Sequence, residues 1–377
     1  MDNQRKKQII IAIITLLAFI FCITSCQKKE EAKQEQPKEE QAIKKEVKKE
    51  ETAVSSGAIK CGNITILDTR TDLTDRSRAK QNVEDALIKY TDISCLVGLW
   101  SYNGPAILSA VKNAKKEGKI PIVCFDEEED TLQGIADGYI HATVVQQPFE
   151  FGYQSVKVLA ALAREDVSLI PPDTVIEVPV KSIRKGDVQE FWGHIKNLLA
   201  EGSKASETEE PKSGKEEKIR IAFVTNSVSD FWKYARAGIK KAEKEFNVTC
   251  EFHMPPDGTP AEQQRIVEAL IAKKVSGMAI SPCDPANQTE LINKACEFMN
   301  VITQDSDALG SNRKCYIGTN NYKAGREAGK LIKEVLPNGG NIMLFVGRLD
   351  AQNAIERRQG IIDELSGKPM PETSLER

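Results

Sequence analysis

The stretch that most constrains this chain is Asn341–Gly367, because it encodes one strand and one helix that cannot be stable by themselves. Ile342–Val346 is a short apolar run typical of a buried parallel strand, and Gly347 permits a turn after it. Asn353–Leu365 then places apolar residues at helical spacing, and the polar segment KPMPETSLER follows. A strand and a helix cannot bury their apolar faces alone, so we expect their partner strands from the front of the chain, starting near Gly62.

The composition allows two ordinary domains and gives no reason to expect a nucleic-acid partner. The chain has 377 residues, of which 40% are hydrophobic and 28% are charged, and its formal net charge is -3. Such a chain can build globular cores, whereas its slight acidity offers no attraction to a phosphate backbone. We therefore expect a globular protein with special segments at its front.

The first 25 residues have the pattern of a secretory signal. Basic residues at Arg5 to Lys7 precede the apolar run Ile9–Ile23, and small residues lead to Cys26. The order Ile-Thr-Ser-Cys resembles a bacterial lipobox, which implies that Cys26 carries lipid and anchors the mature protein to a membrane. The alternative is an uncleaved transmembrane anchor, although the run is short for a span of about 20 residues. Both interpretations place the rest of the chain outside the cytoplasm.

Two polar segments interrupt the rest of the chain. Residues 26–58 and 201–217 consist mainly of Lys, Glu, Gln, Ala and Ser, with few apolar side chains to bury. Such segments cannot offset the entropy cost of ordering, so we predict a disordered tether and a linker, with residues 368–377 as a tail.

The cysteines predict buried free thiols. Nine cysteines become seven if Cys22 leaves with the signal and Cys26 carries lipid, and those seven show no CxxC spacing. Most follow the pattern of Cys124, which lies between Val123 and Phe125 in an apolar run, where a thiol behaves as a small hydrophobe.

Strand and helix patterns alternate between the tether and the linker. The predicted strands are Ile64–Asp68, Cys95–Leu99, Ile120–Phe125 and Ile140–Val145. The predicted helices are Arg78–Tyr90, Pro105–Glu117, Leu132–Asp137, Phe149–Ala163 and Val188–Leu199. Regular alternation of this kind predicts an α/β fold with a parallel sheet that is covered by helices on both faces.

The section after the linker repeats the same pattern. Its predicted strands are Ile219–Val224, Val248–Phe252, Ser276–Ile280 and Val301–Gln304. Phe231–Phe246 is a predicted helix, Thr259–Glu262 has the residues of a capped helix start, and Asp284-Pro285 is expected to open a further element in a similar way. We therefore expect a second parallel sheet of the same kind.

Several motifs together resemble the type I periplasmic sugar-binding proteins. Motifs of the family's first lobe and early second lobe lie in the later part of this chain: IAFV at 221–224, SDFW at 229–232, VITQDSDA at 301–308, IGTNN at 317–321 and NAIER at 353–357. Motifs of the later second lobe lie earlier: residues 96–101, IVCFD at 122–126 and VQQP at 145–148. The resemblance covers about residues 63–367 and implies two lobes around one cleft, each a parallel sheet flanked by helices.

The order of these motifs is reversed relative to the family. Every expected segment occurs once, but the late part comes first, so we predict a circular permutation in which residues 201–217 join the former ends. The rival explanation, a fusion of two truncated copies, would leave both halves without complete cores. The predicted boundaries are residues 59–146, 175–200 and 320–367 for the second lobe, and residues 147–174 and 218–319 for the first lobe. We expect the chain to cross between lobes near Gln146, near Val175–Lys181 and near Thr319–Asn321.

Three polar residues stand at the ends of apolar strands, where ligands bind in open parallel sheets. Asp305, Asp126 and Gln146 each follow such a strand. Strand-end aspartates are also common as turn residues or helix caps, but the resemblance implies that both carboxylates bind sugar hydroxyls, through charge-assisted hydrogen bonds of about 1.5 to 3 kcal/mol each. It also implies that Arg357 donates to the sugar ring, where the alternative is a solvated helix charge beside Arg358.

The resemblance implies aromatic contacts as well, since flat rings cover the apolar faces of a pyranose. Phe231 and Trp232 match the family's paired aromatics, and we expect at least one of them to stack on the sugar rather than belong to the core. Trp100 stands where ribose-type members have asparagine, which leaves the identity of the sugar open. The remaining candidates for binding are Ser229, Asn353 and Asp72.

No catalytic or metal-binding constellation stands out. The histidines at 141, 194 and 253 lack metal-ligand spacing, and neither GxSxG nor a phosphate-binding glycine pattern occurs. We expect no enzyme activity, no metal and no cofactor.

The resemblance therefore implies a lipid-anchored, extracytoplasmic binding protein that captures a monosaccharide and delivers it to an ABC-type permease. We expect a monomer attached to the membrane through its anchor. The main alternative is a sensor of the same fold that signals to a membrane kinase or chemoreceptor, and a third class is a structural lipoprotein whose cleft has decayed. A cytoplasmic repressor is disfavoured by the signal and by the lack of a helix-turn-helix pattern.

Overall fold

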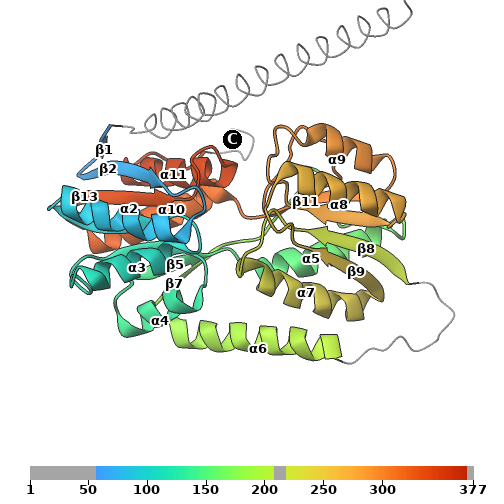
Figure 1. The fold of residues 1–377 in the computed structure, drawn as a ribbon, viewed down its shortest axis with the longest axis horizontal. Coiled ribbons are helices and arrows are strands. Elements are labelled where there is room, and N and C mark those ends of the chain that lie inside the picture. Colours follow the sequence, from blue (N-terminus) through green and yellow to red (C-terminus); the bar gives the residue numbers. More distant parts are fainter. Residues whose placement is uncertain (1–56, 208–217, 372–377) are drawn as a thin grey trace, which may run out of the picture. The chain divides into compact units, whose positions relative to one another are not determined.

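The computed structural model describes residues 57–207 and 218–371, and for residues 201–207 the backbone alone. The predicted signal, Cys26 and nearly all of the tether lie outside the described residues. The described residues form two sheets, each covered by helices on both faces (Figure 1). None of the described helices has the length and apolar character that crossing a membrane requires.

Sheet A contains seven strands, of which the outermost two run antiparallel to their neighbours and the rest are parallel. In spatial order they are β1 (Ile59–Cys61), β2 (Ile64–Thr71), β13 (Gly340–Val346), β3 (Ile93–Gly98), β4 (Ile122–Phe125), β5 (Ala142–Val145) and β7 (Lys181–Arg184).

The pairing of β2 with β13 confirms that the front of the chain supplies the partner of the strand near its end. The two strands run parallel, with Ile64 opposite Gly340 and Ile66 opposite Ile342. Figure 1 shows the blue β2 beside the red β13. The side chains of Ile64, Ile66 and Ile342 belong to one buried cluster, so this pairing contributes to a core that neither segment could form alone.

Helices cover both faces of sheet A. On one face lie α10 (Asn321–Val335) and α11 (Gln352–Leu365), which share a buried cluster with β2 and β13. On the other face lie α2 (Arg76–Lys89), α3 (Asn103–Asn113) and α4 (Glu129–Asp137). The sequence did not mark α10 as a helix, because its lysines, its two glutamates and its four buried small residues give a weak apolar signal.

Sheet B contains six strands, all parallel. In spatial order they are β6 (Val175–Glu177), β12 (Tyr316–Gly318), β11 (Asn300–Gln304), β10 (Gly277–Ile280), β8 (Ile219–Val224) and β9 (Val248–His253). One face packs against α5 (Pro148–Leu162) and α7 (Phe231–Phe246), and the other against α8 (Pro260–Ala272) and α9 (Thr289–Cys296).

The chain passes between the two sheets at four places, between β5 and α5, between β6 and β7, between β7 and β8, and between β12 and α10. The helix α5 follows a strand of sheet A but packs against α7 on sheet B, as the sequence predicts for Phe149–Ala163. One predicted boundary is wrong: residues 175–177 do not belong with sheet A. They form β6 and pair with β12, because their backbone continues the parallel ladder of sheet B, so the return to sheet A lies between Glu177 and Lys181.

The helix α6 (Val188–Glu207) is longer than predicted. The sequence pattern predicts that this helix ends at Leu199 and that a disordered linker begins at residue 201, but the helix continues to Glu207. Alanine, lysine and glutamate propagate a helix well even where few apolar residues are present, so polarity alone did not end it. The helix contacts both α7 and α4, and it therefore touches elements that belong to different sheets.

Helix starts follow the expected capping chemistry in one case and depart from it in another. Thr259 caps α8 by accepting a hydrogen bond from the Glu262 N–H at 3.3 Å. Asp284 does not open a helix: its backbone carbonyl closes a turn with Asn287, and α9 begins only at Thr289. The described cysteines are all free thiols, as predicted, and Cys283 and Cys296 are only partly buried.

Candidate functional site

Two aspartates mark equivalent positions at the carboxyl ends of the two sheets. Asp126 follows β4 and Asp305 follows β11, and both adopt left-handed backbone angles, with φ of 67° and 60°. Their backbone N–H groups donate to Val144 O at 2.9 Å and to Ile317 O at 3.1 Å on the neighbouring strands. A left-handed aspartate is uncommon and its strain is frequent at binding sites, so this repeated geometry points to a functional edge on each sheet.

The Asp305 carboxylate is buried among hydroxyl and amide donors. Ser281 Oγ donates to its Oδ2 at 2.9 Å, and Asn226 Nδ2 donates to the same oxygen at 3.2 Å. Burial raises the pKa of Asp305 to about 6, while the Ser281 hydrogen bond and the charge of Arg357 oppose that rise. Both protein donors use one oxygen, and within the described residues the other oxygen, Oδ1, has no hydrogen bond.

The Asp126 carboxylate lies on sheet A and is also buried. Gln146 Nε2 donates to its Oδ1 at 2.9 Å, which joins two of the predicted site residues. Burial raises the pKa of Asp126, and the charge of Arg357 and the Gln146 hydrogen bond oppose this rise. Asp126 and Gln146 follow neighbouring strands, β4 and β5, so the parallel register explains why their side chains meet.

Arg357 connects the two carboxylates electrostatically. It projects from α11, is 1% exposed, and donates through Nε to Asn321 Oδ1 at 2.9 Å and through Nη1 to Leu99 O at 2.7 Å. Its guanidinium carbon lies 4.5 Å from the centroid of the Phe125 ring. The alternative interpretation of Arg357 as a solvated helix charge is therefore wrong.

Arg357 does not form a direct ion pair with either aspartate. Desolvation lowers its pKa, and the charges of Asp126 and Asp305 raise it, so all three groups feel one another. Yet within the described residues no guanidinium nitrogen of Arg357 lies within 4.0 Å of a carboxylate oxygen of either aspartate. The three charged groups therefore interact through space and not through direct ion pairs.

Trp100 and Asn353 form a second contact on the same sheet. Trp100 Nε1 donates to Asn353 Oδ1 at 3.2 Å, and the indole packs edge-on to Tyr102. The indole also covers Gly347, where a Cβ would lie 2.0 Å from a ring carbon. The turn after β13 therefore requires glycine for the close approach of this ring.

The carboxylate oxygens of Asp72 accept hydrogen bonds from neighbouring residues beside sheet A. Asp72 accepts hydrogen bonds from the Tyr102 hydroxyl, from Asn103 Nδ2 at 3.0 Å and from the Thr74 N–H at 2.9 Å. Burial raises the pKa of Asp72. These bonds give Asp72 a role in holding the connection between β2 and α2, and they leave it little capacity to accept from a ligand.

The predicted aromatic pair divides into a core residue and a partly exposed one. Trp232 is 2% exposed and packs edge-on against Phe223 and Phe231, with ring centroids 6.0 and 4.9 Å apart. Phe231 is half-buried and lies 6.0 Å from Phe151. Ser229 Oγ accepts from the Phe231 N–H at 3.3 Å and shapes the start of α7. Phe231 thus has more surface to offer a ligand than Trp232.

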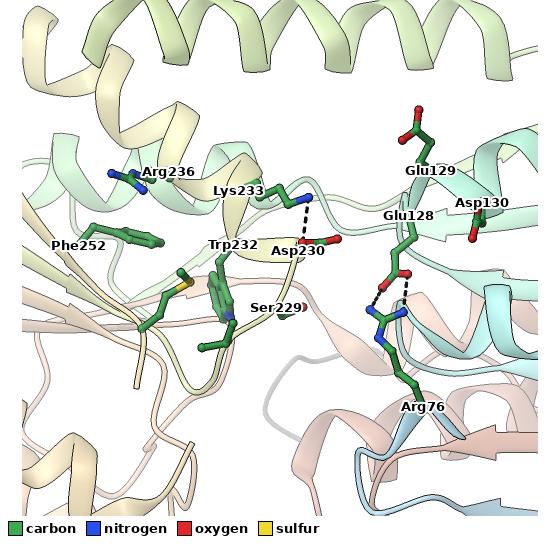
Figure 2. A pocket seen from close by; sticks show the side chains of 12 residues that line it. Arg76, Glu128, Glu129, Asp130, Ser229, Asp230, Trp232, Lys233, Arg236 and Phe252 are labelled. Atoms are coloured by element: carbon green, nitrogen blue, oxygen red, sulfur yellow. Dashed lines mark hydrogen bonds and ion pairs between the residues drawn. The ribbon is translucent and has the colours of Figure 1, made fainter. Parts of the chain in front are cut away.

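Two cavities lie beside the start of α7, and both have walls from each sheet. The larger has a volume of about 660 Å³, and Figure 2 shows its two sides. On one side Arg76 forms a two-pronged ion pair with Glu128, at 3.0 and 2.8 Å, and on the other Lys233 pairs with Asp230 at 2.9 Å. The residues shared with the predicted site are Ser229 and Trp232.

The smaller cavity has a volume of about 180 Å³ and is lined by Asp126 and Phe231 among the predicted residues. The helix α6 closes it with Trp192, Ile195, Lys196 and Leu199. The Tyr234 hydroxyl of α7 donates to the Glu127 backbone carbonyl at 3.3 Å, which is a direct hydrogen bond between elements of the two sheets.

Sequence reasoning missed several residues around the charged groups. Asn226 and Ser281 follow β8 and β10, so the strand-end argument that selected Asp305 applies to them equally. Asn321 opens α10 just after a crossing between sheets, where it accepts from Arg357. Glu127 was overlooked because it stands in the acidic run 126–130, which looks like a solvated surface. Within the described ranges, no cluster of histidine, cysteine and acidic residues has the geometry to hold a metal ion.

Comparisons with solved structures find partial likenesses. A solute-binding protein of an ABC transporter from Burkholderia graminis, in complex with D-arabinose, is 31% identical, covering 41% of this chain and 55% of that chain with a TM-score of 0.39. AraP, an arabinose-binding protein from Geobacillus stearothermophilus, is 32% identical, covering 40% and 52% with a TM-score of 0.37. GanP, a glucose-galactose binding protein from the same organism, is 29% identical, covering 40% and 54% with a TM-score of 0.37.

The chain thus spans about half the length of these structures. No curated protein matches it. The family model that describes a periplasmic binding protein domain matches residues 27–166 and 221–375, which make up most of the chain. The chain therefore belongs to the periplasmic binding protein family, whose members bind solutes and are not enzymes.

Proposed function

We propose that this protein captures a monosaccharide in the cleft between its two sheets and delivers it to an ABC-type permease. In this proposal it is a monomer that Cys26 anchors to the outer side of a cytoplasmic or outer membrane through lipid. The observation that carries the proposal is the grouping of Asp126, Asp305 and Arg357, three buried charged groups from both sheets that interact without direct ion pairs.

The chemistry of this grouping suits a polyol. Each sugar hydroxyl can donate to a carboxylate and accept from a guanidinium, and Gln146 offers both an acceptor and a donor. Such charge-assisted bonds are the strong ones in a desolvated site, whereas an apolar ligand would add no hydrogen bond to any of the three charges. Phe231 and Trp100 supply ring surface for the apolar faces of a pyranose.

The placement of these groups on different sheets supports a closing motion. Asp305 follows a strand of sheet B, whereas Asp126 follows a strand of sheet A and Arg357 lies on α11, which packs on sheet A. The chain crosses between the sheets at four places. A ligand that bonds to both sheets stabilises the closed arrangement more than the open one, which is the differential contact that such a motion needs. Closure then creates a surface that a permease recognises. Periplasmic binding proteins are known to close around their ligands by a hinge motion of this kind.

We also propose that the fold is a circular permutation of the family's usual order, with the lobe boundaries given above shifted so that residues 175–177 join the first lobe. Its support is the parallel pairing of β2 with β13, which brings together the early and late strands of the chain in one sheet. The two segments also meet at Gly62, where an added Cβ would lie 3.3 Å from Leu365 O. A break in the ancestral chain between these points would leave both segments in contact.

A thermal-shift screen of monosaccharides tests the proposed function. A ligand at 100 times its dissociation constant adds about 2.7 kcal/mol to the free energy of unfolding, so a binder should raise the melting temperature clearly. The shift should vanish in Asp305→Ala and remain in Asp85→Ala, because Asp85 is an exposed carboxylate on α2 away from the cleft. A complete panel of pentoses and hexoses that leaves the wild-type melting temperature unchanged would reject the proposal.

The lipid anchor has a separate test. Expressed with its own leader in a bacterial host, the wild-type chain should partition with membranes, and a Cys26→Ser variant should not. Equal membrane association of the two chains would reject lipidation of Cys26 and favour the uncleaved anchor.

A further inference from the structure

Glu127 carries a buried carboxyl group without a hydrogen-bond partner among the residues that the structure describes. The residue is 2% exposed, and neither of its carboxylate oxygens has a hydrogen-bond partner within the part of the chain that the structure describes. Burial first, and then the charge of Asp126, raises the pKa of Glu127 well above its ordinary value. A buried acceptor without a donor costs about 1 to 3 kcal/mol, so a ligand that supplies donors at this point gains by doing so.

Glu127 lines the smaller cavity together with three aromatic side chains. These are Trp192 of α6, and Phe231 and Tyr234 of α7. The cavity volume of about 180 Å³ is that of a small group rather than of a large ligand. Aromatic faces attract cations, and carboxylates beside such faces form the usual environment for an ammonium group.

The cations near this cavity already have partners, and those of Lys196 and Lys233 are themselves residues of the cavity lining. Lys233 pairs with Asp230 at 2.9 Å, and Lys196 lies 4.1 Å from the centroid of the Trp192 ring. Arg76 is held by both oxygens of Glu128. Among the described residues, Glu127 therefore has no cationic side chain as an ion-pair partner.

The balance of buried charge in the cleft favours a positively charged ligand. The buried carboxyl groups of Asp126 and Asp305 interact with one buried guanidinium, on Arg357, and Glu127 beside Asp126 adds a third buried carboxyl group. A neutral sugar leaves this excess in place, so that some carboxyl groups must stay protonated or bear the cost of a buried charge. An ammonium group removes part of the excess and satisfies the unpartnered acceptor at the same time.

We propose that the ligand carries a protonated amino group, which Glu127 binds in the smaller cavity next to Asp126 while the hydroxyl groups bind to Asp126, Asp305 and Arg357. The substrate class is then an amino sugar or a related polyhydroxy amine. This inference rests on the proposed function, since it assigns a ligand class to the same cleft.

The binding should be linked to proton release. Glu127 without ligand holds its proton to a higher pH than an exposed glutamate does, whereas an ammonium group favours the ionised form. Binding therefore expels a proton, and the affinity for an amine rises with pH until the amine itself loses its charge. The charged or titratable groups that face Glu127 are Asp126 beside it, Glu128 and Glu129 at the start of α4, Asp230, Lys233 and Tyr234 on α7, and Lys196 on α6.

Calorimetric titration with matched pairs of sugars tests the inference. Glucosamine, galactosamine and mannosamine are compared with glucose, galactose and mannose at pH 7, on the full chain without its leader. We expect at least one amino sugar to bind ten times or more tightly than its neutral counterpart. Titration of that amino sugar in buffers of different ionisation enthalpy should reveal proton release.

Two variants assign the preference to Glu127. Glu127→Gln retains the shape of the side chain and should abolish the preference for the amino sugar over its neutral counterpart. Glu129→Gln is the matched control, since Glu129 is an exposed carboxylate on the same cavity, and it should retain the preference. Far-ultraviolet circular dichroism and a thermal melt check that both variants are folded.

The outcomes separate this inference from the proposed function. Neutral sugars that bind as well as or better than the amino sugars overturn the inference and leave the sugar-binding function intact. A preference that persists in folded Glu127→Gln also overturns the assignment. The absence of binding by every sugar in both sets rejects the proposed function, and the inference with it.

Discussion

At the scale of single residues, the site is built from carboxylates that the fold holds in costly positions. Asp126 and Asp305 combine a left-handed backbone with burial, and each has only amide or hydroxyl donors from the protein at short range. Such positions persist only where the surrounding structure imposes them. Their common geometry on two sheets is the physical basis for assigning the cleft as a binding site.

Replacement of Asp126 by alanine should weaken binding of the sugar by about 2 to 4 kcal/mol, which corresponds to the loss of one or two charge-assisted hydrogen bonds. The melting temperature without ligand should change little, because Asp126 ends a strand and its side chain is not part of an apolar cluster. Titration calorimetry on Asp126→Ala and on the exposed-site control Asp85→Ala measures the difference. An unchanged affinity in Asp126→Ala would show that this carboxylate does not contact the sugar.

The raised pKa of Asp305 predicts how the stability of the ligand-free protein depends on pH. Its folded pKa of about 6 lies above its ordinary value of 3.8, so the folded state binds more protons between these values than the unfolded state does. Stability therefore falls as the pH rises from about 4 through 6, by about 3 kcal/mol for this group. In Asp305→Asn this part of the pH dependence should be absent, and urea unfolding of both proteins at pH 4.5 and pH 7.5 measures it. Parallel pH profiles for the two proteins would contradict the assigned pKa.

The type of each residue and its place relative to a strand explain which parts of the candidate site could be predicted from the sequence. Asp126, Gln146 and Asp305 follow apolar strands, so their clustering follows from sheet geometry. The burial of Trp232 could not be read from the sequence, because the start of a helix gives no signal of which face the ring takes. The isolation of Glu127 depends on the packing of α6 and α7, which come from elsewhere in the chain.

At the scale of elements, each sheet uses one pair of closely crossing helices. On sheet B, a Cβ on Gly152 of α5 would lie 2.0 Å from Ala235 O, and one on Gly238 of α7 would lie 2.0 Å from Phe149 O. On sheet A, α10 and α11 approach in the same way through Gly325 and Gly360, with distances of 2.1 and 2.2 Å to backbone oxygens. In each pair one helix, α5 or α10, directly follows a segment that crosses between the sheets. Close packing at these glycines therefore fixes the crossing segments.

Gly152→Ala should destabilise the protein by about 1 to 3 kcal/mol, because the added methyl group meets backbone that cannot move away without separating the helices. Chemical denaturation measures the change. Gly193→Ala on α6 is the matched control, since nothing lies within 4 Å of its Cβ position, and it should stabilise the helix by about 0.5 to 1 kcal/mol. Equal effects of the two substitutions would mean that the helices are not in close contact at Gly152.

The strands and most helices were predictable because their apolar periodicity is strong, as in β8 and α7, whose bounds match the prediction. The short strands β6, β7 and β12 were not, because three or four residues in a polar context show no period, and only their neighbours define them. The extension of α6 beyond Leu199 was missed because residues that form a good helix can look, by composition, like a disordered linker.

At the scale of the whole molecule, the early and late segments of the chain complete one sheet. The permutation predicts that the chain can be returned to the family's usual order without loss of the fold. A variant that joins residue 367 to residue 62 through a short glycine-serine linker, and begins at Lys218 and ends at Leu199, should fold with a melting temperature close to that of the parent. Its sugar affinity should also be retained, because no site residue is removed. The control is the parent protein without residues 1–56. If this control folds and the rearranged chain does not, the result would argue against the permutation.

The central claim is that one bound sugar touches both sheets. A crystal structure of the protein with the ligand found by the monosaccharide screen tests it most directly. The account predicts ordered sugar in the cleft, with oxygen atoms within 3.2 Å of Asp126, of Asp305 and of Arg357 in the same complex. A sugar that occupies another surface, or that contacts the carboxylate of one sheet only, would contradict it.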